Sequence, residues 1–395
     1  MMTKSSALIL GGHYAALSIA RSLGNRGITV YCHDQNPNAV TLRSRHVKRF
    51  CPGTSRSELL EEIKALSDRA GEKPILYITA DTFLTFISEN GRELRSYVRY
   101  PYLDDELINI LVDKSKSERI FEKSELRIPK TWLIDGEIST APKHLPTQTV
   151  IKPLLQTDWT QNSEAMQITN DRKVLRFDNP ALAQSTIHKM RPFGAMAVQE
   201  FVPGDDKNLY YYVGYRAADG QILASFTGRK LRTLQEGMGS ETLLSSEGAD
   251  DVAQLGMSVL KKLNIIGPAG IDIKRNAETG ELFVIEVNHR FGLSDGILTS
   301  AGIDLPMIYY RDMCGEQIEP VIRHRTDINW VWLEPELRLN SQSFLKLIKC
   351  MASLLTLALR GRLCVNEFAI SDPLPGLGPI FDRLMERVGK GLRHA

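Results

Sequence analysis

Two neighbouring predicted strands with acidic and amide side chains in their interiors constrain the fold of this 395-residue chain more than any other feature. The strands cover residues 270–275 and 282–287, and the turn Asn276–Gly280 joins them into a hairpin. Asp and Asn are depleted in strand interiors. We therefore predict an antiparallel sheet in which one face of this hairpin serves a purpose other than packing.

Three oxygen-bearing side chains share that face. Glu286 and Asn288 are two residues apart and leave the same side of their strand, and hairpin pairing can place Asp272 across from them. Mg²⁺ prefers octahedral oxygen ligands and usually shares them with substrate phosphates. We therefore predict that the triplet holds Mg²⁺, as two ions with Glu286 bridging; the alternative is a solvated polar sheet face. The apolar residues between them are expected to enter the core: Ile271, Ile273, Ile285 and Val287.

A site for metal and phosphate also needs positive charge to share the charge of the phosphates. The candidates are Lys114, Lys152, Arg229, Lys230 and Arg290. Each of these residues alone is typical of a solvated surface. Their occurrence together with the acidic triplet is what indicates a site for a nucleoside triphosphate.

The segment Gln199–Gly204 offers a place for the base of such a nucleotide. It is a predicted strand that Pro203 and Gly204 interrupt, and Asp205 and Asp206 follow it. Adenine recognition needs backbone donors and acceptors at an exposed strand end, and this segment provides them.

The N-terminal segment has a different pattern, in which strands and helices alternate. A strand over residues 7–10 leads through Gly11-Gly12 into a helix over 14–24, and a second strand ends near Asp34. This order implies parallel pairing with a right-handed crossover. A dinucleotide fingerprint would need glycines at 11, 13 and 16, but positions 13 and 16 are His13 and Ala16. We interpret the glycines as a tight turn; the alternatives are a substrate-facing loop and a nicotinamide site.

The pattern of predicted strands and helices divides the chain into three parts. Residues 1–112 are predicted to form an α/β, Rossmann-like domain. Residues 113–330 form an α+β domain of antiparallel strands and a few helices, with a first subdomain over 113–195 and a second over 196–330. Residues 331–395 form an amphipathic, helical C-terminal extension.

The C-terminal extension contains a strongly amphipathic predicted helix over Phe344–Leu359. From Ser341 to Ala395, eight Lys and Arg residues face four Asp and Glu residues, a local net charge of +4. The main interpretation is that this helix packs on its own domain or on a partner chain, as in a homodimer. The other is peripheral contact with an anionic membrane surface.

Composition excludes several classes of protein. The net charge of +2 provides no basic field for nucleic acid. Five scattered cysteines without a C-x-x-C pair favour reduced thiols in a cytoplasmic protein over a disulfide framework or a zinc ribbon. No stretch reaches about 18 uninterrupted apolar residues, so no membrane span is expected.

The order of four motifs resembles the ATP-grasp superfamily, and in particular its carboxylate–amine ligases, such as the D-alanine–D-alanine and D-aspartate ligase-like enzymes. The motifs are VIKP (residues 150–153), QEFVPG (199–204), GID (270–272) and FVIEVNHR (283–290). The resemblance covers residues 5 to 320, about four-fifths of the chain. It implies a pre-ATP-grasp domain followed by an ATP-grasp domain, and a ligase that forms a carbon–nitrogen bond through an acyl-phosphate and releases ADP and phosphate.

The resemblance also implies roles for individual residues. Lys114 and Lys152 would contact ATP phosphates, and Lys230 or Arg229 the γ-phosphate. Arg290 would steady the acyl-phosphate or the carboxylate substrate, and the triplet would hold Mg²⁺ or Mn²⁺. The nucleoside contacts would come from Gln199, Glu200, Phe201 and Val202 at adenine and from Asp206 at the ribose.

One departure from the family concerns the loop after Lys152, which contains no glycine over residues 153–163, where a glycine-rich phosphate loop often stands. A second loop over 236–240 is expected to cover the site, or else to be an ordinary surface turn. The glycine-rich segment 290–306 is expected either to cradle a carboxylate or to lead into a helix. Two rival functions stay open: a nucleotide-sensing or scaffold protein on this fold, and a nicotinamide-dependent oxidoreductase.

Overall fold

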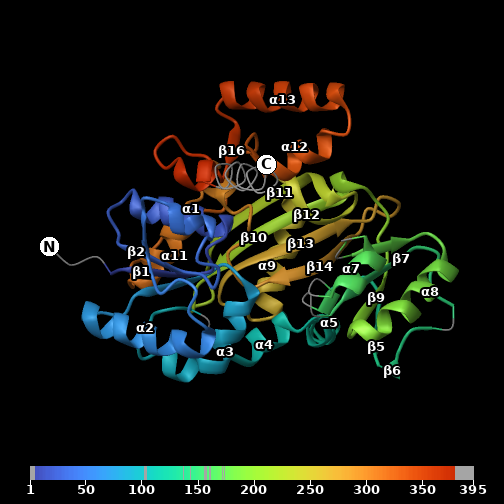
Figure 1. Ribbon diagram of the computed structural model, residues 1–395, viewed down its shortest axis with the longest axis horizontal. Coiled ribbons are helices and arrows are strands. Elements are labelled where there is room, and N and C mark those ends of the chain that lie inside the picture. Colours follow the sequence, from blue (N-terminus) through green and yellow to red (C-terminus); the bar gives the residue numbers. More distant parts are fainter. Residues whose placement is uncertain are drawn as a thin grey trace, which may run out of the picture.

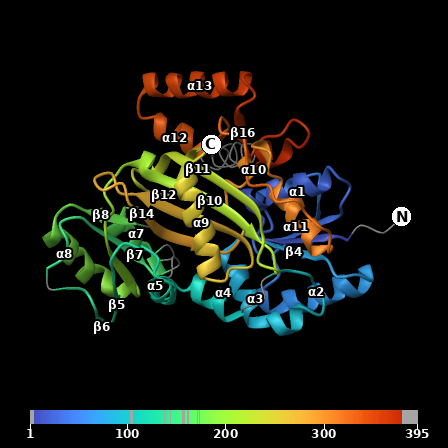
Figure 2. The same ribbon diagram turned by 180° about the vertical axis from the view of Figure 1, so that it is seen from behind.

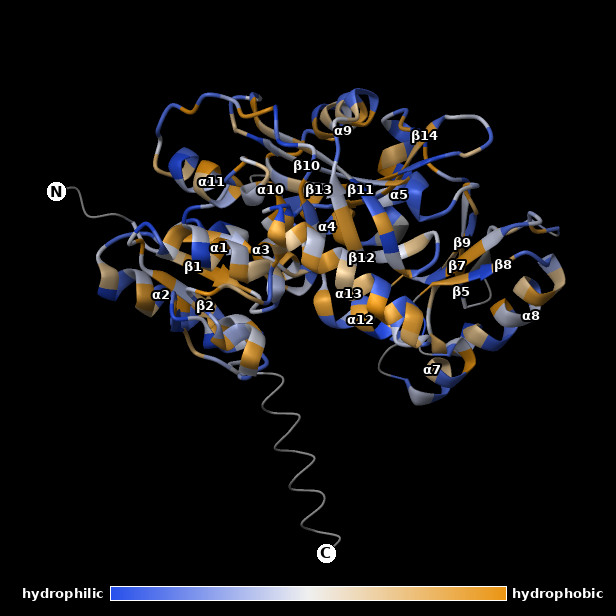
Figure 3. Ribbon diagram, turned by 90° about the horizontal axis from the view of Figure 1, so that it is seen from above, coloured by the Kyte–Doolittle hydropathy of each residue, from blue (hydrophilic) through white to orange (hydrophobic). Residues whose placement is uncertain are grey.

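The computed structural model describes residues 5–101, 105–136, 138–142, 144–154, 158–159, 162–170, 172 and 174–378. Within these residues the strands form a four-stranded, a five-stranded and a seven-stranded sheet. The four-stranded and five-stranded sheets lie at opposite ends of the molecule, with the seven-stranded sheet between them (Figure 1 and Figure 3).

The N-terminal sheet is parallel, in the order β3-β2-β1-β4. Its strands are β1 (Ala7–Leu10), β2 (Val30–His33), β3 (Val47–Arg49) and β4 (Ile75–Ile78). Its helical elements are α1 (Tyr14–Gly24), η1 (Val40–Arg43), α2 (Arg56–Ala70), α3 (Asp81–Leu94) and α4 (Asp105–Val112). Alternate β1 side chains enter two different cores, Ile9 with α1 and Leu8 with α2 and α3. Helices therefore cover both faces, as the alternating pattern predicts.

The glycine turn after β1 is a tight turn closed by side chains of its own domain. Gly11 has φ +102°, which only glycine adopts readily, and Thr79 occupies the space beside it. The Gly12 N–H donates to Asp34 Oδ2 at 2.5 Å, so the carboxylate expected at a dinucleotide ribose serves the turn itself. This geometry supports the structural interpretation over the nicotinamide site.

The five-stranded sheet is antiparallel, in the order β6-β5-β9-β7-β8. Its strands are β5 (Thr131–Asp135), β6 (Ile138–Ser139), β7 (Thr149–Pro153), β8 (Leu175–Phe177) and β9 (Met196–Glu200). Its helical elements are α5 (Lys114–Lys123), which precedes it, and α7 (Ser163–Thr169), α8 (Pro180–Met190) and η2 (Arg191–Phe193). The sequence analysis begins the second subdomain at residue 196. However, β9 pairs with β5 and β7, so the chain leaves this sheet only after Glu200.

The seven-stranded sheet has the order β14-β13-β10-β11-β12-β15-β16. Its first five strands along the chain are β10 (Leu209–Arg216), β11 (Ile222–Gln235), β12 (Met238–Ser246), β13 (Gly267–Arg275) and β14 (Leu282–Asn288). A short 3-10 helix, η3 (Asp206–Asn208), precedes β10. Helix α9 (Asp250–Lys262) covers one face (Figure 2) and packs on Tyr212, Ile271 and Ile273. On the other face, Tyr211, Tyr215 and neighbouring side chains share a core with the N-terminal domain.

The chain after β14 ties the large sheet to the N-terminal domain. Phe291 N–H donates to Ile78 O at 3.1 Å, at the end of β4, and the Phe291 ring packs on Tyr77 with 5.5 Å between centroids. Helices α10 (Gly296–Ser300) and α11 (Leu305–Met313) follow and enter the same core. The expected passage from a glycine-rich segment into a helix that ends near Met313 is thus present.

The C-terminal segment is not purely helical. Strand β16 (Leu363–Val365) pairs in parallel with β15 (Asn329–Val331) and extends the large sheet, so the described part of the C-terminal segment, residues 331–378, is not separate from it. The other elements are α12 (Leu333–Asn340) and α13 (Phe344–Leu359). Asp372 anchors the segment to the N-terminal domain, because it accepts hydrogen bonds from Ser44 Oγ at 2.8 Å and Arg21 Nε at 3.0 Å.

None of the helices in the described part of the chain combines the length and the apolar character that a membrane span requires.

Candidate active site

The three side chains of the predicted metal triplet share one sheet face. Asp272 pairs directly with Glu286, and Asn288 pairs with Gly270, two positions further along. Side chains at such positions leave the sheet on the same side. The core prediction is confirmed for Ile271, Ile273 and Val287, which are buried.

A register shift beside the triplet changes the course of β14. Asp272 pairs with Glu286, but Ile273 pairs with Val284, so Ile285 is an extra residue without a partner opposite it. Bulges of this kind redirect side chains and are common next to active sites. As a result, Ile285 is only partly buried and lines a pocket, contrary to the prediction that it belongs to the core.

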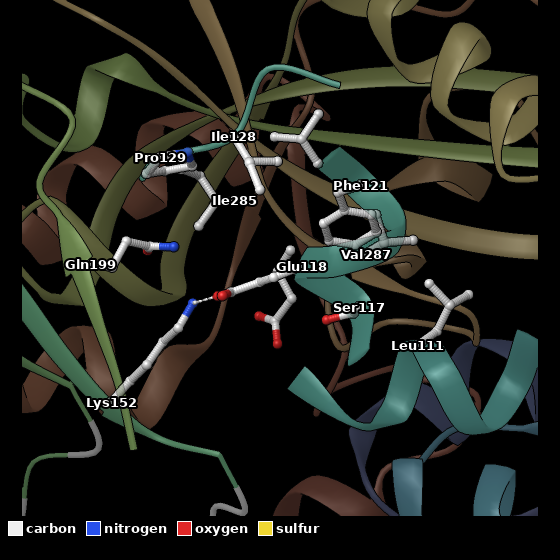
Figure 4. A pocket seen from close by; sticks show the side chains of 12 residues that line it. Leu111, Ser117, Glu118, Phe121, Ile128, Pro129, Lys152, Gln199, Ile285 and Val287 are labelled. Carbon is white, nitrogen blue, oxygen red and sulfur yellow. Dashed lines mark ion pairs between the residues drawn. The ribbon is translucent and has the colours of Figure 1, made fainter. Parts of the chain in front are cut away.

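That pocket lies between α5, the five-stranded sheet and β14 (Figure 4). Lys152 of β7, Gln199 of β9 and Glu286 of β14 line it, and Lys152 Nζ lies 3.9 Å from Glu118 Oε1 of α5. The remaining lining is mostly apolar: Leu111, Ser117, Phe121, Ile128, Pro129, Val284, Ile285 and Val287.

Lys230 is the cation closest to the triplet. Its Nζ lies 2.8 Å from Asp272 Oδ1 and 3.1 Å from Glu241 Oε2, and its side chain is only 3% exposed. Burial lowers the pKa of Lys230, but the two carboxylates outweigh burial, so the pKa is raised and the ammonium stays charged.

The carboxylates around Lys230 repel one another. Burial raises the pKa of Asp272, to about 6, and Glu241 and Glu286 add to this rise while Lys230 opposes it. For Glu241, burial raises the pKa but Lys230 outweighs it, so its pKa is lowered. A divalent cation would relieve this repulsion, so the donor set fits Mg²⁺, which is commonly held by one or two carboxylates and substrate phosphates. Among the described residues no group of three His, Cys, Asp or Glu side chains has metal-binding geometry.

Arg290 connects the triplet with the N-terminal domain. Its Nε donates to Asp81 Oδ1 at 2.5 Å, and its Nη2 donates to Asp81 Oδ2 and to Asn288 Oδ1, both at 3.2 Å. Asp81 is the first residue of α3. Arg290 therefore lies beside the triplet, and a two-point contact with Asp81 of the N-terminal domain fixes its direction.

The predicted adenine segment is the end of β9. Gln199 is buried in the pocket wall and its Nε2 donates to Thr131 Oγ1 at 2.8 Å. The side chains of Phe201 and Val202 are buried, while that of Glu200 is exposed. Two cations contact the Phe201 ring, since Arg176 Cζ and Lys274 Nζ each lie 3.9 Å from the ring centroid.

Two predicted site residues have partners elsewhere. Asp206, expected at a ribose, instead accepts hydrogen bonds from Thr233 N, Thr233 Oγ1 and Gly237 N at 2.6–3.1 Å and closes the β11–β12 hairpin. Arg229, expected at the γ-phosphate, pairs with Glu247 at 2.5 Å and with Tyr210 Oη at 2.9 Å. Because neighbouring residues in a strand point to opposite faces, Arg229 faces the α9 side while Lys230 faces the triplet.

Other loop predictions have mixed outcomes. Residues 236–240 are the tip of the β11–β12 hairpin rather than a separate loop, since Gln235 pairs with Met238. In the predicted carboxylate cradle, Gly292 N–H already donates to Asp295 Oδ2 at 2.7 Å, and Asn366 fills the space beside Gly296. The side chain of Lys114 and part of the loop after Lys152, residues 155–157, 160 and 161, lie outside the described residues.

Four site residues were missed by the sequence analysis: Glu118, Glu241, Lys274 and Asp81. Of these, Lys274 had a local signal, because it lies two residues after Asp272 in the same strand and so shares its face. It is 3% exposed, its Nζ donates to Gly237 O at 3.1 Å, and burial lowers its pKa to about 8, with a further lowering from Arg176. The other three reach the site only through long-range pairing.

Three sheets, with a pocket between the five-stranded and the seven-stranded one, are the arrangement of a class of protein, the ATP-grasp fold. The chain is similar to N5-carboxyaminoimidazole ribonucleotide synthetase in its ADP complex, with a TM-score of 0.62, 12% identity and coverage of 82% of this chain and 80% of that chain. It is also similar to biotin carboxylase from Campylobacter jejuni, with a TM-score of 0.59, 12% identity and coverage of 82% and 74%. L-Amino acid ligase from Bacillus licheniformis has a TM-score of 0.58, 14% identity and coverage of 80% and 78%.

A more particular similarity comes from the sequence. The chain is 23% identical over 322 residues to the D-aspartate ligase of Enterococcus faecium (strain Aus0004), covering 77% of this chain and 76% of the relative. No family model matches the chain. The resemblance to ATP-grasp carboxylate–amine ligases is thereby confirmed, and the enzyme class predicted from the sequence, a ligase that forms a carbon–nitrogen bond, agrees with these relatives.

Proposed function

We propose that the protein is an ATP-dependent carboxylate–amine ligase that acts through an acyl-phosphate. The observation that carries this proposal is the direct pairing of Asp272 with Glu286 at a pocket that also contains Lys152, with Lys230 buried against Asp272. Oxygen ligands and cations are thus neighbours at one site, as the phosphates of a metal-bound nucleotide require. The similarity to D-aspartate ligase and L-amino acid ligase favours an amino acid or related carboxylate as substrate.

In the proposed reaction, a carboxylate oxygen of the first substrate attacks the γ-phosphorus of ATP, and ADP leaves. The nitrogen of the amine then attacks the acyl carbon, and phosphate leaves with the electrons of the carbon–oxygen bond. The amine loses a proton in this step. Catalysis of both steps comes mainly from positioning and from neutralisation of charge.

Each residue has a role that follows from its place. Asp272, Glu286 and Asn288 would hold Mg²⁺, which neutralises charge on the phosphates when bound. Lys152 would contact phosphate from the five-stranded sheet and Lys230 from the large sheet. Arg290, oriented by Asp81, would bind the carboxylate or the acyl-phosphate. The end of β9 would provide the adenine contacts from Gln199 to Val202.

The test is an assay of ADP and phosphate release with Mg²⁺, ATP and a panel of amino acids and hydroxy acids offered in pairs with amines. We expect one pair to release ADP and phosphate in equal amounts, with kcat on the order of 1–100 per second. Mass spectrometry should find the condensed product. If the protein binds ATP but no pair releases ADP, the sensor or scaffold function is the correct one.

A further inference from the structure

Helix α13 forms a layer of its own at one end of the molecule, above α12 and β16 (Figure 1 and Figure 2). Leu354 is its one buried residue, and Leu347, Cys350 and Leu357 beside it are partly buried. These positions form a single line along the helix that faces the rest of the protein. The helix therefore packs on the rest of the protein through one narrow face. Packing on its own domain, one of the arrangements expected from the sequence, accounts for only part of the apolar surface of the helix.

A second apolar stripe on α13 faces solvent. The exposed side chains are Phe344, Leu345, Ile348, Met351, Leu355 and Leu359, with exposed fractions from 46% for Ile348 to 80% for Leu359. At about 100° per residue these residues fall within a stripe roughly 120° wide, and 16 residues make it about 24 Å long. Most turns of the helix carry hydrophobic residues (Figure 3). Exposed apolar patches of this extent usually mark an interaction site.

Basic residues border the exposed apolar stripe on one side. Lys346, Lys349 and the C-cap residue Arg360 lie at steps of three and eleven residues along one edge, all exposed, and the helix contains no Asp or Glu. This is the composition of helices that lie in the interface of an anionic bilayer, with apolar side chains among the acyl chains and cations at the headgroups.

The same charges disfavour a symmetric contact with a second copy of the chain. A twofold interface through the exposed apolar stripe would bring two equal sets of Lys and Arg to its rim. No carboxylate on α13 could neutralise them, whereas anionic headgroups would do so.

We propose that α13 docks the protein on an anionic lipid surface through its exposed apolar stripe. The helix lies in the plane of the interface and does not cross the bilayer. This inference does not depend on the ligase function, since it concerns a surface that contains none of the proposed active-site residues.

The test is sedimentation of the full chain with sucrose-loaded vesicles of phosphatidylcholine alone or with a quarter of phosphatidylglycerol. We expect binding to the anionic vesicles, and little to the neutral ones. The variant Met351→Glu/Leu355→Glu should reduce binding by at least about tenfold, because two charges enter the centre of the apolar stripe. The variant Lys346→Gln/Lys349→Gln should weaken binding to anionic vesicles about fivefold for each charge lost.

Leu182→Glu is the matched control, because Leu182 is a similarly exposed leucine (60%) on α8 in the five-stranded subdomain. It should leave vesicle binding unchanged. Failure of the wild-type protein to sediment with anionic vesicles would overturn the proposal. It would also be overturned by light scattering that finds a dimer which Met351→Glu/Leu355→Glu converts to monomer, since the stripe would then belong to a second copy.

Discussion

Replacing Glu286 with Gln should reduce substrate-dependent ADP release by at least about 100-fold, because the change removes one negative charge and one metal-ligand oxygen while retaining size. Glu286 lies opposite Asp272 at the pocket, so the substitution affects the position where both predicted ions would meet the phosphates. The apparent affinity for Mg²⁺ should fall in parallel. Steady-state rates over a range of Mg²⁺ concentrations measure both effects.

Glu278→Gln provides the matched control for this substitution. Glu278 is an exposed glutamate in the β13–β14 turn, on the same hairpin but away from the pocket. Its activity and Mg²⁺ dependence should equal those of the wild-type protein. Full activity in Glu286→Gln, with normal Mg²⁺ dependence, would remove the proposed metal site from the mechanism.

Lys230→Met should lower both stability and activity. The substitution leaves Asp272 and Glu241 buried without the ammonium that lies between them, and loss of one partner in a buried charge cluster costs about 3–5 kcal/mol. Urea denaturation in the presence of EDTA measures the free energy of unfolding without metal. Activity should fall at least about 100-fold, since the same ammonium is proposed to contact the transferred phosphate.

A second substitution separates these effects. In Lys230→Met/Glu241→Gln one of the two unpaired carboxylates is removed, so much of the stability should return while activity stays low. Arg229→Met is the matched control from the adjacent position. It loses a pair with Glu247 in which both side chains are about one-third exposed, so stability should change by about 1 kcal/mol or less and activity should persist. A greater loss of activity in Arg229→Met than in Lys230→Met would contradict the assignment of the two residues to opposite faces.

The hairpin that carries the triplet could be predicted from the sequence because its information is local. The turn Asn276–Gly280, the apolar residues between the polar ones and the two-residue spacing of Glu286 and Asn288 all lie within 20 residues. For the same reason α1 and α13 begin and end at the residues predicted for them. Even here the bulge at Ile285 was not predicted, because it depends on how two strands pair.

Other parts of the site depend on contacts that no local pattern contains. Arg229 and Lys230 are equally basic, and which one faces the triplet depends on the register of β10 and β11. Glu241 joins Lys230 through β12, where several register shifts interrupt the ladder. Asp81 meets Arg290 across a separation of 209 residues. The family resemblance implies a ribose contact for Asp206, but no local pattern predicts that Thr233 and Gly237 at the hairpin tip donate three hydrogen bonds to it.

The most direct test of the central claim is calorimetric titration of the wild-type protein with ATP, once in buffer that contains Mg²⁺ and once in buffer that contains EDTA. We predict that the wild-type protein binds one ATP per chain in Mg²⁺ and binds ATP much more weakly in EDTA. The affinity of Glu286→Gln for ATP should be equally weak in both conditions. Binding of ATP with the same affinity in both conditions, or no binding in either, would contradict the proposal that Asp272, Glu286 and Asn288 hold a metal ion against the phosphates.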